Sequence, residues 1–233
     1  MQNTIQLPDN IQYLGPLPEK KEHFLNKIYP KIKRFNDIFF SLIFILMVWP
    51  LMLIIAILIK LDSKGPIFYL QERASINGKP FNLIKLRTMI VDADKIDLVT
   101  HDNDSRITRI GKIIRYCSLD EIPQIINILK GDMSFVGPRA QPMKFKDQWL
   151  SEGILNVQPG ILSWAVLHGR EKLPYEYRFI LEREYIEQLS WETDSYIIFT
   201  TLNKYKNIFK WVLIPLFIVI IISCILVYYL IVG

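Results

Sequence analysis

The feature that most constrains this sequence is an apolar run, about as long as a bilayer is thick, with a proline inside it. The run IFFSLIFILMVWPLMLIIAILI extends from Ile38 to Ile59, and roughly 20 apolar residues suffice for a helix to span a bilayer. Pro50 lies near its centre. A proline removes a backbone donor and clashes with the preceding turn, so we expect a kink or break there.

Basic residues flank this run on both sides, and Lys and Arg favour the cytoplasmic side of a membrane. A helix that enters, breaks at Pro50 and returns satisfies both flanks. A kinked helix that spans the bilayer is the alternative, because membrane helices tolerate proline, and the flanks alone leave both open. The run begins too far from Met1 to be a signal peptide. The flanking residues are Lys27, Lys31, Lys33 and Arg34 before the run, and Lys60 and Lys64 after it.

A second apolar run, WVLIPLFIVIIISCILVYYLIV, extends from Trp211 to Val232. Lysines precede it and no charged residue follows it. This asymmetry predicts a C-terminal transmembrane helix over residues 209–233 with its first end in the cytoplasm.

The composition fits a membrane protein with a cationic surface. Hydrophobic residues make up 51% of the 233 residues, and 28 Lys and Arg exceed 23 Asp and Glu. We expect no nucleic-acid partner, because no recognised nucleic-acid motif accompanies the charge. Cys117 and Cys224 lie in different segments, so a disulfide framework is not expected. The histidines are too scattered to favour zinc.

The segment between the two runs carries the polar residues that can do chemistry. PIFYLQERASINGKPFNLIKLRTM predicts a β-hairpin that turns at Asn77-Gly78, since Asn-Gly is the strongest short hairpin signal. RITRIGKIIRYC, from Arg106 to Cys117, predicts an amphipathic basic helix. This helix lies either on an anionic membrane surface or over the domain core with its basic face in solvent.

The motif SLDEIPQIINIL sets two carboxylates side by side at the start of an apolar helix. One interpretation is a capping box, in which Ser118 and Glu121 bond the free amides of the first turn. The other is catalytic, because adjacent carboxylates such as Asp120 and Glu121 can hold Mg²⁺ together with water and substrate phosphates. An ionised aspartate can also attack phosphorus. Four cationic side chains are available to grip a diphosphate, namely Lys85, Arg87, Arg115 and Arg139.

At this point the sequence resembles the bacterial sugar transferase family, small monotopic phosphoglycosyl transferases that start glycan assembly on a polyprenyl phosphate. The resemblance covers most of the chain, from about residue 33 to residue 205. It rests on the Pro50 run followed by LDSKGPIFYLQER, NGKPFNLIKLRTM, ITRIGKIIRYCSLDEIPQIINILKGDMSFVGPRA and QPGILSWAVLHGR.

The resemblance implies that the Pro50 segment is a re-entrant helix that holds the enzyme on the cytoplasmic face of the inner membrane. It implies that Asp120 is the nucleophile and Glu121 its metal-linked partner, with Mg²⁺ as the cofactor. The remaining residues expected to bind substrate are Lys85, Arg87, Arg115, Pro138, Arg139 and Arg170.

These expectations give an α+β fold in four segments. An N-terminal arm covers residues 1–34, the re-entrant membrane helix 35–61, the catalytic domain 62–208 and the C-terminal transmembrane helix 209–233. The catalytic domain is expected to be a small mixed domain with the β-hairpin and interfacial amphipathic helices.

The expected reaction moves a sugar 1-phosphate from a nucleotide diphosphate sugar, a UDP sugar by preference, to undecaprenyl phosphate through an aspartyl phosphosugar. This would initiate surface glycan or exopolysaccharide assembly. A membrane phosphohydrolase and a non-catalytic membrane scaffold are the alternatives. Membrane lipid is an expected partner, and a second copy of the chain or downstream glycosyltransferases are the protein partners to consider.

The sequence departs from the family pattern at several positions. Where the family commonly reads Gln-x-Arg-x-Gly, this chain has Ser75 in place of the glycine. Where the family commonly reads PGITGWAQVNGR, this chain has Leu162, Ser163, Val166 and His168. We expect these changes to bear on sugar or base recognition more than on phosphate chemistry. Glu182 stands where an aspartate is usual and has no assigned role.

Overall fold

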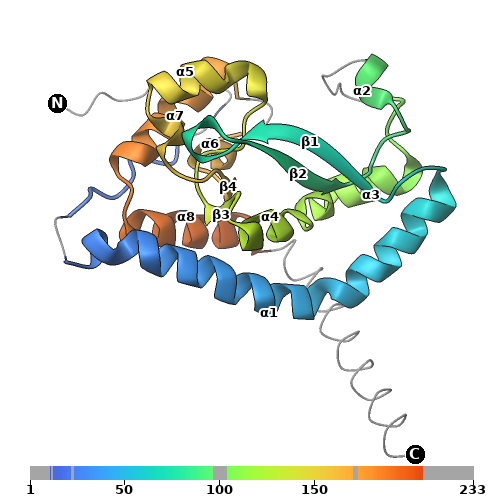
Figure 1. Ribbon diagram of the computed structural model, residues 1–233, viewed down its shortest axis with the longest axis horizontal. Coiled ribbons are helices and arrows are strands. Elements are labelled where there is room, and N and C mark those ends of the chain that lie inside the picture. Colours follow the sequence, from blue (N-terminus) through green and yellow to red (C-terminus); the bar gives the residue numbers. More distant parts are fainter. Residues whose placement is uncertain (1–10, 12, 22–23, 97–103, 170–172, 207–233) are drawn as a thin grey trace, which may run out of the picture. The chain divides into compact units, whose positions relative to one another are not determined.

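A computed structural model describes residues 11, 13–21, 24–96, 104–169 and 173–206 of the chain. It is a mixture of helices and short strands with a long apolar helix and a β-hairpin (Figure 1), as the α+β class predicts. The predicted C-terminal transmembrane helix lies outside the described residues. The chain divides into two compact units. The first unit comprises Met1–Ile38, Glu72–Asn82 and Ile128–Lys204, and the second comprises Phe39–Gln71, Leu83–Asn127 and Tyr205–Gly233.

The described residues form eight helices, four strands and four 3₁₀ turns. The helices are α1 Phe24–Asp62, α2 Ala93–Ile96, α3 Arg109–Tyr116, α4 Gln124–Lys130, α5 Lys146–Ser151, α6 Trp164–Leu167, α7 Tyr175–Glu187 and α8 Trp191–Lys204. The strands are β1 Phe68–Ala74, β2 Pro80–Leu86, β3 Ser134–Val136 and β4 Gly160–Leu162. Four 3₁₀ turns are η1 Ile76–Gly78, η2 Leu119–Glu121, η3 Met143–Phe145 and η4 Ile154–Asn156.

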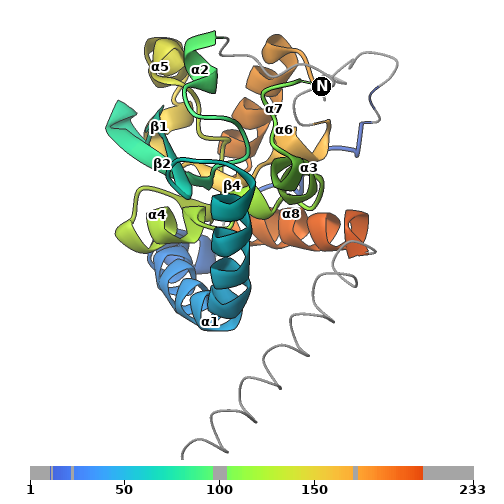
Figure 2. The ribbon, with the colours of Figure 1, turned by 90° about the vertical axis from the view of Figure 1, so that its right-hand side faces the viewer.

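Helix α1 is longer than the apolar run from which it was predicted. It begins at Phe24, within the expected N-terminal arm, and continues to Asp62. Figure 1 and Figure 2 show that its path changes direction part-way along. Such a bend is the expected effect of Pro50, the proline in the apolar part of the helix. Re-entry of this helix into one membrane face remains a prediction.

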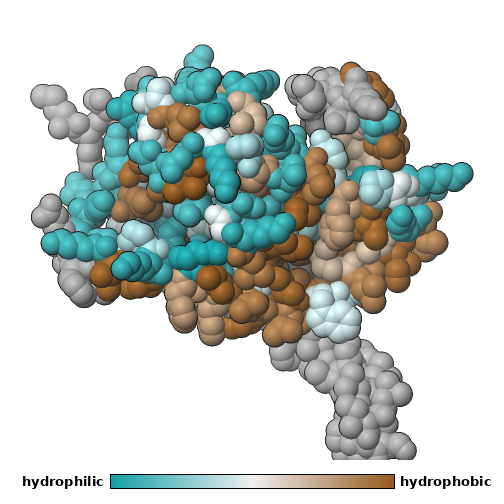
Figure 3. Space-filling model, viewed as in Figure 1, coloured by the Kyte–Doolittle hydropathy of each residue, from teal (hydrophilic) through white to brown (hydrophobic). Residues whose placement is uncertain are grey.

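Many large side chains of α1 are exposed although they are hydrophobic. Among the described residues, Asn26–Asp62 is the one helical segment long and apolar enough to cross a membrane. Figure 3 shows the hydrophobic side chains gathered over α1. An apolar surface of this extent is typical of contact with lipid or with another protein. Its exposed members include Phe35, Phe39, Phe40, Leu42, Leu46, Trp49, Leu53, Ile57 and Leu61.

The earlier part of α1 is held in the first unit by polar contacts. Lys33 donates to the carbonyl of Val136 at 2.8 Å and forms an ion pair with Asp194. Asp37 accepts hydrogen bonds from the Ser134 hydroxyl and from a neighbouring backbone amide of β3. These polar contacts, which are partly or fully buried, explain why the helix extends into the region predicted to be an arm.

The core of the second unit joins the later part of α1 to the hairpin and α3. Ile55 and Ile59 of α1 pack with Leu86 of β2 and Ile114 of α3, and all four side chains are buried. Asp62, the last residue of α1, accepts the backbone N–H of Ile110 in the first turn of α3 at 3.0 Å. The end of α1 and the start of α3 are therefore fixed to each other.

The predicted hairpin is confirmed. Strands β1 and β2 pair, and the turn between them contains Asn77 with φ 56° and Gly78 with φ 70°. Ser75, which replaces a glycine of the family pattern, has an extended backbone with φ −102° and needs no glycine there. Its hydroxyl donates to the carbonyl of Asp132 at 2.6 Å.

The first unit contains a parallel pair of very short strands that the sequence did not predict. Strand β3 pairs with β4, with Ser134 opposite Gly160 and Val136 opposite Leu162. A Cβ at Gly160 would lie 2.1 Å from the backbone nitrogen of Gly137. Only glycine therefore allows the two backbones to approach this closely.

A separate cluster around the buried Trp149 forms a hydrophobic core under α5 and α7.

Candidate functional site

The two predicted catalytic carboxylates lie in the second unit, in the short 3₁₀ turn η2 between α3 and α4. Helix α3 ends at Tyr116, and Ser118 then adopts a left-handed conformation with φ 55°. This conformation turns the chain sharply, so Asp120 and Glu121 follow within one turn of the end of α3. A non-glycine residue with positive φ is uncommon and carries a conformational cost.

The capping-box interpretation of this motif is wrong. The side chain of Ser118 makes no capping hydrogen bond, because its left-handed backbone is not that of an ordinary N-cap residue. Asp120 and Glu121 belong to the 3₁₀ turn itself, whereas α4 begins three residues later at Gln124. The carboxylates therefore require an explanation other than this cap.

The electrostatic surroundings of Asp120 combine opposing influences. Burial raises the pKa of Asp120, and the neighbouring Glu121 carboxylate raises it further. Lys85 of β2 and Arg115 of α3 act in the opposite direction and lower the pKa of Asp120. Burial has the largest effect, so the pKa of Asp120 is raised overall, and two of the predicted cationic residues offset part of that rise.

Arg115 is held in place by a residue that sequence reasoning did not select. Its Nε donates to Oγ1 of Thr88 at 2.8 Å, and Thr88 is buried directly after the hairpin. The backbone of Thr88 is fixed in turn, because its carbonyl accepts the N–H of Thr108 at 3.0 Å. The signal in the sequence is the KLRTM motif, in which Thr88 directly follows the predicted substrate-binding residue Arg87.

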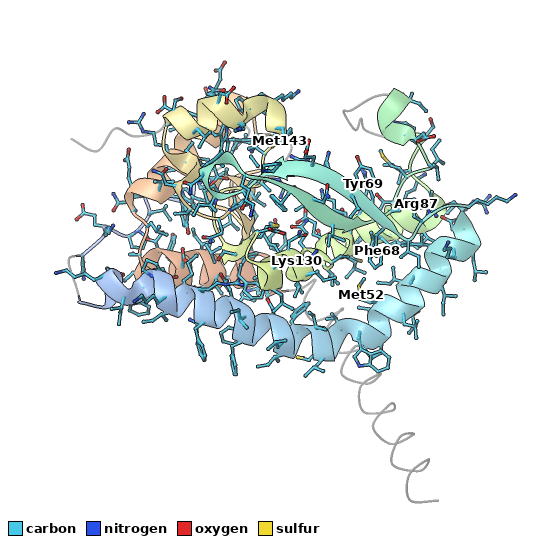
Figure 4. The ribbon with its side chains drawn as sticks, viewed as in Figure 1. Met52, Phe68, Tyr69, Arg87, Lys130 and Met143 are labelled. Atoms are coloured by element: carbon cyan, nitrogen blue, oxygen red, sulfur yellow. The ribbon has the colours of Figure 1, made fainter. Side chains whose placement is uncertain are left out.

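Arg87 has a different environment from the other predicted cations. Figure 4 labels this side chain, whose guanidinium donates to the backbone carbonyls of Ser63 and Lys64 at the end of α1. Arg87 is 6% exposed. These contacts give it a structural role just after the end of α1, and its part in substrate binding stays a prediction.

The predicted Gly-Pro-Arg turn lies in the first unit, where β3 ends. The backbone of this turn is bonded to β4 on both sides of Pro138. Gly137 donates to the carbonyl of Leu162 at 3.0 Å, and Gly160 donates to the carbonyl of Pro138 at 2.8 Å. The parallel pairing of β3 and β4 therefore fixes the backbone from which Arg139 projects.

Glu182, which had no assigned role, is a buried partner of this turn. Its Oε1 accepts the backbone N–H of Arg139 at 2.9 Å and a hydrogen bond from the Ser163 hydroxyl. The side chain of Glu182 is fully buried, and burial raises its pKa to about 7. Its second oxygen, Oε2, has no hydrogen-bond partner among the described residues.

Comparison with known proteins decides the family. The sequence matches the bacterial sugar transferase family over residues 28–208. The chain belongs to this family.

Three relatives of this sugar transferase are named for a transfer to undecaprenyl phosphate. A UDP-N-acetylgalactosamine-undecaprenyl-phosphate N-acetylgalactosaminephosphotransferase of Aeromonas hydrophila is 40% identical over 185 residues, which cover 76% of this chain and 44% of the relative. A UDP-glucose:undecaprenyl-phosphate glucose-1-phosphate transferase of Escherichia coli strain K12 is 37% identical over 74% of this chain and 40% of its own length. An undecaprenyl-phosphate glucose phosphotransferase of Komagataeibacter xylinus is 39% identical over 74% of this chain and 35% of its own length. The chain thus spans less than half the length of these relatives.

The donor set of this sugar transferase fits a magnesium ion. Asp120 and Glu121, both in η2, would supply carboxylate oxygens, the type of ligand that Mg²⁺ prefers. No group of three or more His, Cys, Asp or Glu side chains able to hold a metal occurs in the described part of the chain. Since Mg²⁺ commonly takes one or two carboxylates and completes its shell with water and phosphate, two carboxylates suffice.

The remaining predicted residue, Arg170, lies outside the described residues. His168, two residues earlier, is 3% exposed. Its Nδ1 lies 2.9 Å from the carbonyl oxygen of Trp164. The histidine that replaces a residue of the family pattern is therefore a buried part of the fold.

Proposed function

We propose that this sugar transferase moves a sugar 1-phosphate from a nucleotide diphosphate sugar to undecaprenyl phosphate. The observation that carries the proposal is the environment of Asp120, a half-buried carboxylate beside Glu121 whose pKa is raised by burial and whose negative charge Lys85 and Arg115 partly offset. An ionised carboxylate is a competent nucleophile toward phosphorus. The names of the relatives support the reaction class, and two of these names include a UDP sugar.

In the proposed first step, an oxygen of Asp120 attacks the phosphorus next to the sugar. A new bond forms between this oxygen and phosphorus, and the bond from phosphorus to the bridging oxygen of the diphosphate breaks. The bridging oxygen keeps the electron pair and leaves as part of the nucleoside monophosphate. Lys85 and Arg115 stabilise the negative charge that spreads over the phosphoryl oxygens.

In the second step, a phosphate oxygen of undecaprenyl phosphate attacks the same phosphorus. The bond between phosphorus and Asp120 breaks, which regenerates the carboxylate and releases the lipid diphosphate sugar. A magnesium ion held by Asp120 and Glu121 would supply further charge neutralisation when bound. Arg139 and Arg170 stay predicted ligands of the substrate phosphates.

The apolar surface of α1 supports a site at the membrane boundary. One substrate is soluble in water and the other is anchored in the bilayer, so the reaction must take place where both can reach Asp120. We propose that α1 re-enters the cytoplasmic face of the inner membrane. We further propose that the apolar surface of α1 contacts a second copy of the chain or downstream glycosyltransferases in the membrane.

Intact-protein mass spectrometry of the purified chain with donor alone tests this function. The covalent route predicts a protein heavier by one sugar phosphate, together with release of nucleoside monophosphate before any lipid is added. Asp120→Asn should abolish the adduct and lower turnover by several powers of ten, equivalent to roughly 4 kcal/mol or more of barrier. Asp147→Asn, at an exposed position of α5, is the matched control.

Other outcomes of this experiment identify the alternatives. Free sugar phosphate formed without lipid would favour a phosphohydrolase. No adduct in the native protein, together with kinetics that require both substrates to be bound at once, would rule out the covalent route. Failure of the folded, membrane-bound protein to turn over any nucleotide sugar would favour a scaffold.

A further inference from the structure

The backbone of the N-terminal arm donates hydrogen bonds to two side chains, one directly after α6 and one in α7. Leu14 donates its N–H to Nε2 of His168 at 3.2 Å, and Leu17 donates its N–H to Oε1 of Glu184 at 3.0 Å. The ring of Tyr13 stacks on the His168 ring with centroids 5.4 Å apart. The Leu17 side chain is 4% exposed. The arm is therefore packed as well as hydrogen-bonded within the first unit.

The two side chains that receive the arm also hold α6. Nδ1 of His168 lies 2.9 Å from the carbonyl oxygen of Trp164, and Oε2 of Glu184 accepts the indole N–H of Trp164 at 3.0 Å. Because Nδ1 faces a carbonyl, it carries the proton, and Nε2 is free to accept from Leu14. Burial lowers the pKa of His168, which favours this neutral ring. Trp164 is fully buried between these contacts.

The other end of α6 leads to Arg139. Ser163 is the N-cap residue of α6, and its Oγ accepts the N–H of Val166 at 3.3 Å. The same hydroxyl donates to Glu182, whose Oε1 also accepts the backbone N–H of Arg139 at 2.9 Å. A continuous series of packed and hydrogen-bonded groups thus runs from the arm through α6 to the Gly-Pro-Arg turn.

We propose that residues 13–21 are a positioning element for donor binding, which holds α6 through His168 and Glu184 and thereby fixes Arg139. This inference rests on the proposed function only in taking Arg139 as a ligand of the donor phosphates. His168 and Glu184 are positioning residues, since they act through α6. The departure from the family pattern at His168 then serves the arm.

Paired variants of His168 test the link without changing the arm. A glutamine amide reaches the place of Nε2, so His168→Gln keeps an acceptor for Leu14. An asparagine amide stands at the place of Nδ1. His168→Asn therefore keeps a donor for the carbonyl of Trp164 and loses the acceptor for the N–H of Leu14. We expect His168→Asn to raise KM for a UDP sugar about tenfold with kcat changed less than about twofold, and His168→Gln to restore most of the KM.

A variant on the arm gives an independent measurement. Leu17→Ala empties a buried position without touching α6 or Arg139, and Glu19→Ala changes an exposed arm residue as the control. Hydrogen exchange of the full-length protein in detergent should show faster exchange in a peptide that covers Gly137–Ala140 for Leu17→Ala and for His168→Asn. Glu19→Ala should leave this exchange unchanged.

The results separate this inference from the proposed function. Unchanged exchange at Gly137–Ala140 in a variant whose arm has been released would overturn the inference, whatever the activity. Faster exchange with an unchanged KM for the donor would also overturn it, because the arm would then order the turn without serving the donor. Loss of the donor-only adduct in the unmodified protein would instead contradict the proposed function.

Discussion

The backbone N–H of Arg139 lies 2.9 Å from Oε1 of Glu182, a carboxylate that is fully buried and has an oxygen without a partner in the described structure. A buried carboxylate in this position stabilises the turn by accepting hydrogen bonds. Burying its charge costs free energy, and the charge of Arg139 offsets only part of that cost. The cost of the buried charge arises only when Glu182 is ionised, so it grows as pH rises.

Glu182 should therefore make the stability of the protein fall as pH rises. Burial raises the folded pKa of Glu182 from 4.5 to about 7, so between these values the folded state binds more protons than the unfolded state. The contribution of Glu182 to stability is then greatest below pH 4.5 and is lost as pH rises through 7. A shift of this size corresponds to on the order of 3 kcal/mol.

Glu182→Gln tests this dependence because it keeps an acceptor for Arg139 and removes the titration. Unfolding in detergent is measured for both proteins across pH 4.5 to 8. The difference in stability between the variant and the unmodified protein should grow in favour of the variant as pH rises. Parallel curves would show that Glu182 does not titrate in this range.

Thr88 should matter for activity although it carries no charge. Its Oγ1 accepts the Nε of Arg115 at 2.8 Å, and a hydrogen bond to a charged donor is among the stronger ones. Thr88→Val keeps the shape and removes the acceptor, so kcat/KM for the donor should fall about tenfold, or roughly 1.4 kcal/mol. Thr88→Ser keeps the hydroxyl and should retain most activity. Equal losses in the two variants would point to packing instead of to the orientation of Arg115.

Lys85 should set the pH at which Asp120 becomes ionised. Since Lys85 lowers the pKa of Asp120, Lys85→Gln should raise that pKa. The acid limb of the pH profile of kcat/KM should then move to higher pH, in addition to any loss in the height of the profile. Lys112→Gln, at an exposed position of α3, provides the control. An acid limb that stays in place would show that Asp120 is not the group titrating there.

Sequence reasoning identified the features that depend on local pattern. The apolar helix with Pro50, the turn at Asn77-Gly78 and the basic segment that became α3 each carry a periodic or short-range signal. The carboxylate pair was found for the same reason, since its members are adjacent in the chain. The resemblance to the family then supplied the roles that the pattern had left open.

The features that were missed depend on contacts between distant segments. Strands β3 and β4 have three residues each, too few for an alternating pattern. Glu182 and Arg139 are 43 positions apart in the chain, and a local sequence pattern cannot predict a contact between such distant residues. The early start of α1 follows from the partly buried ion pair between Lys33 and Asp194, which composition cannot show.

The topology of α1 is open to a direct test with the full-length chain. If the helix enters and leaves one face of the membrane, residues before and after it lie on the same side, as the basic flanks favour. In a variant without Cys117 and Cys224, single cysteines introduced at Glu19 and at Lys112, both exposed positions, should both react with a membrane-impermeant thiol reagent from the cytoplasmic side. Labelling of only one of them would establish a spanning helix.

Pro50→Ala sharpens this experiment because proline is the physical cause expected for the bend. With the backbone donor restored, the helix should straighten and part of the population should span the bilayer. Protection of either Glu19→Cys or Lys112→Cys should then increase, and activity should fall in proportion to the spanning fraction. Ala56→Ser, at a half-buried position six residues later in the same helix, leaves the proline in place and should change neither measurement. If Pro50→Ala leaves labelling and activity unaltered, then side-chain contacts of α1, such as those of Ile55 and Ile59 with α3, hold the bend without help from the proline.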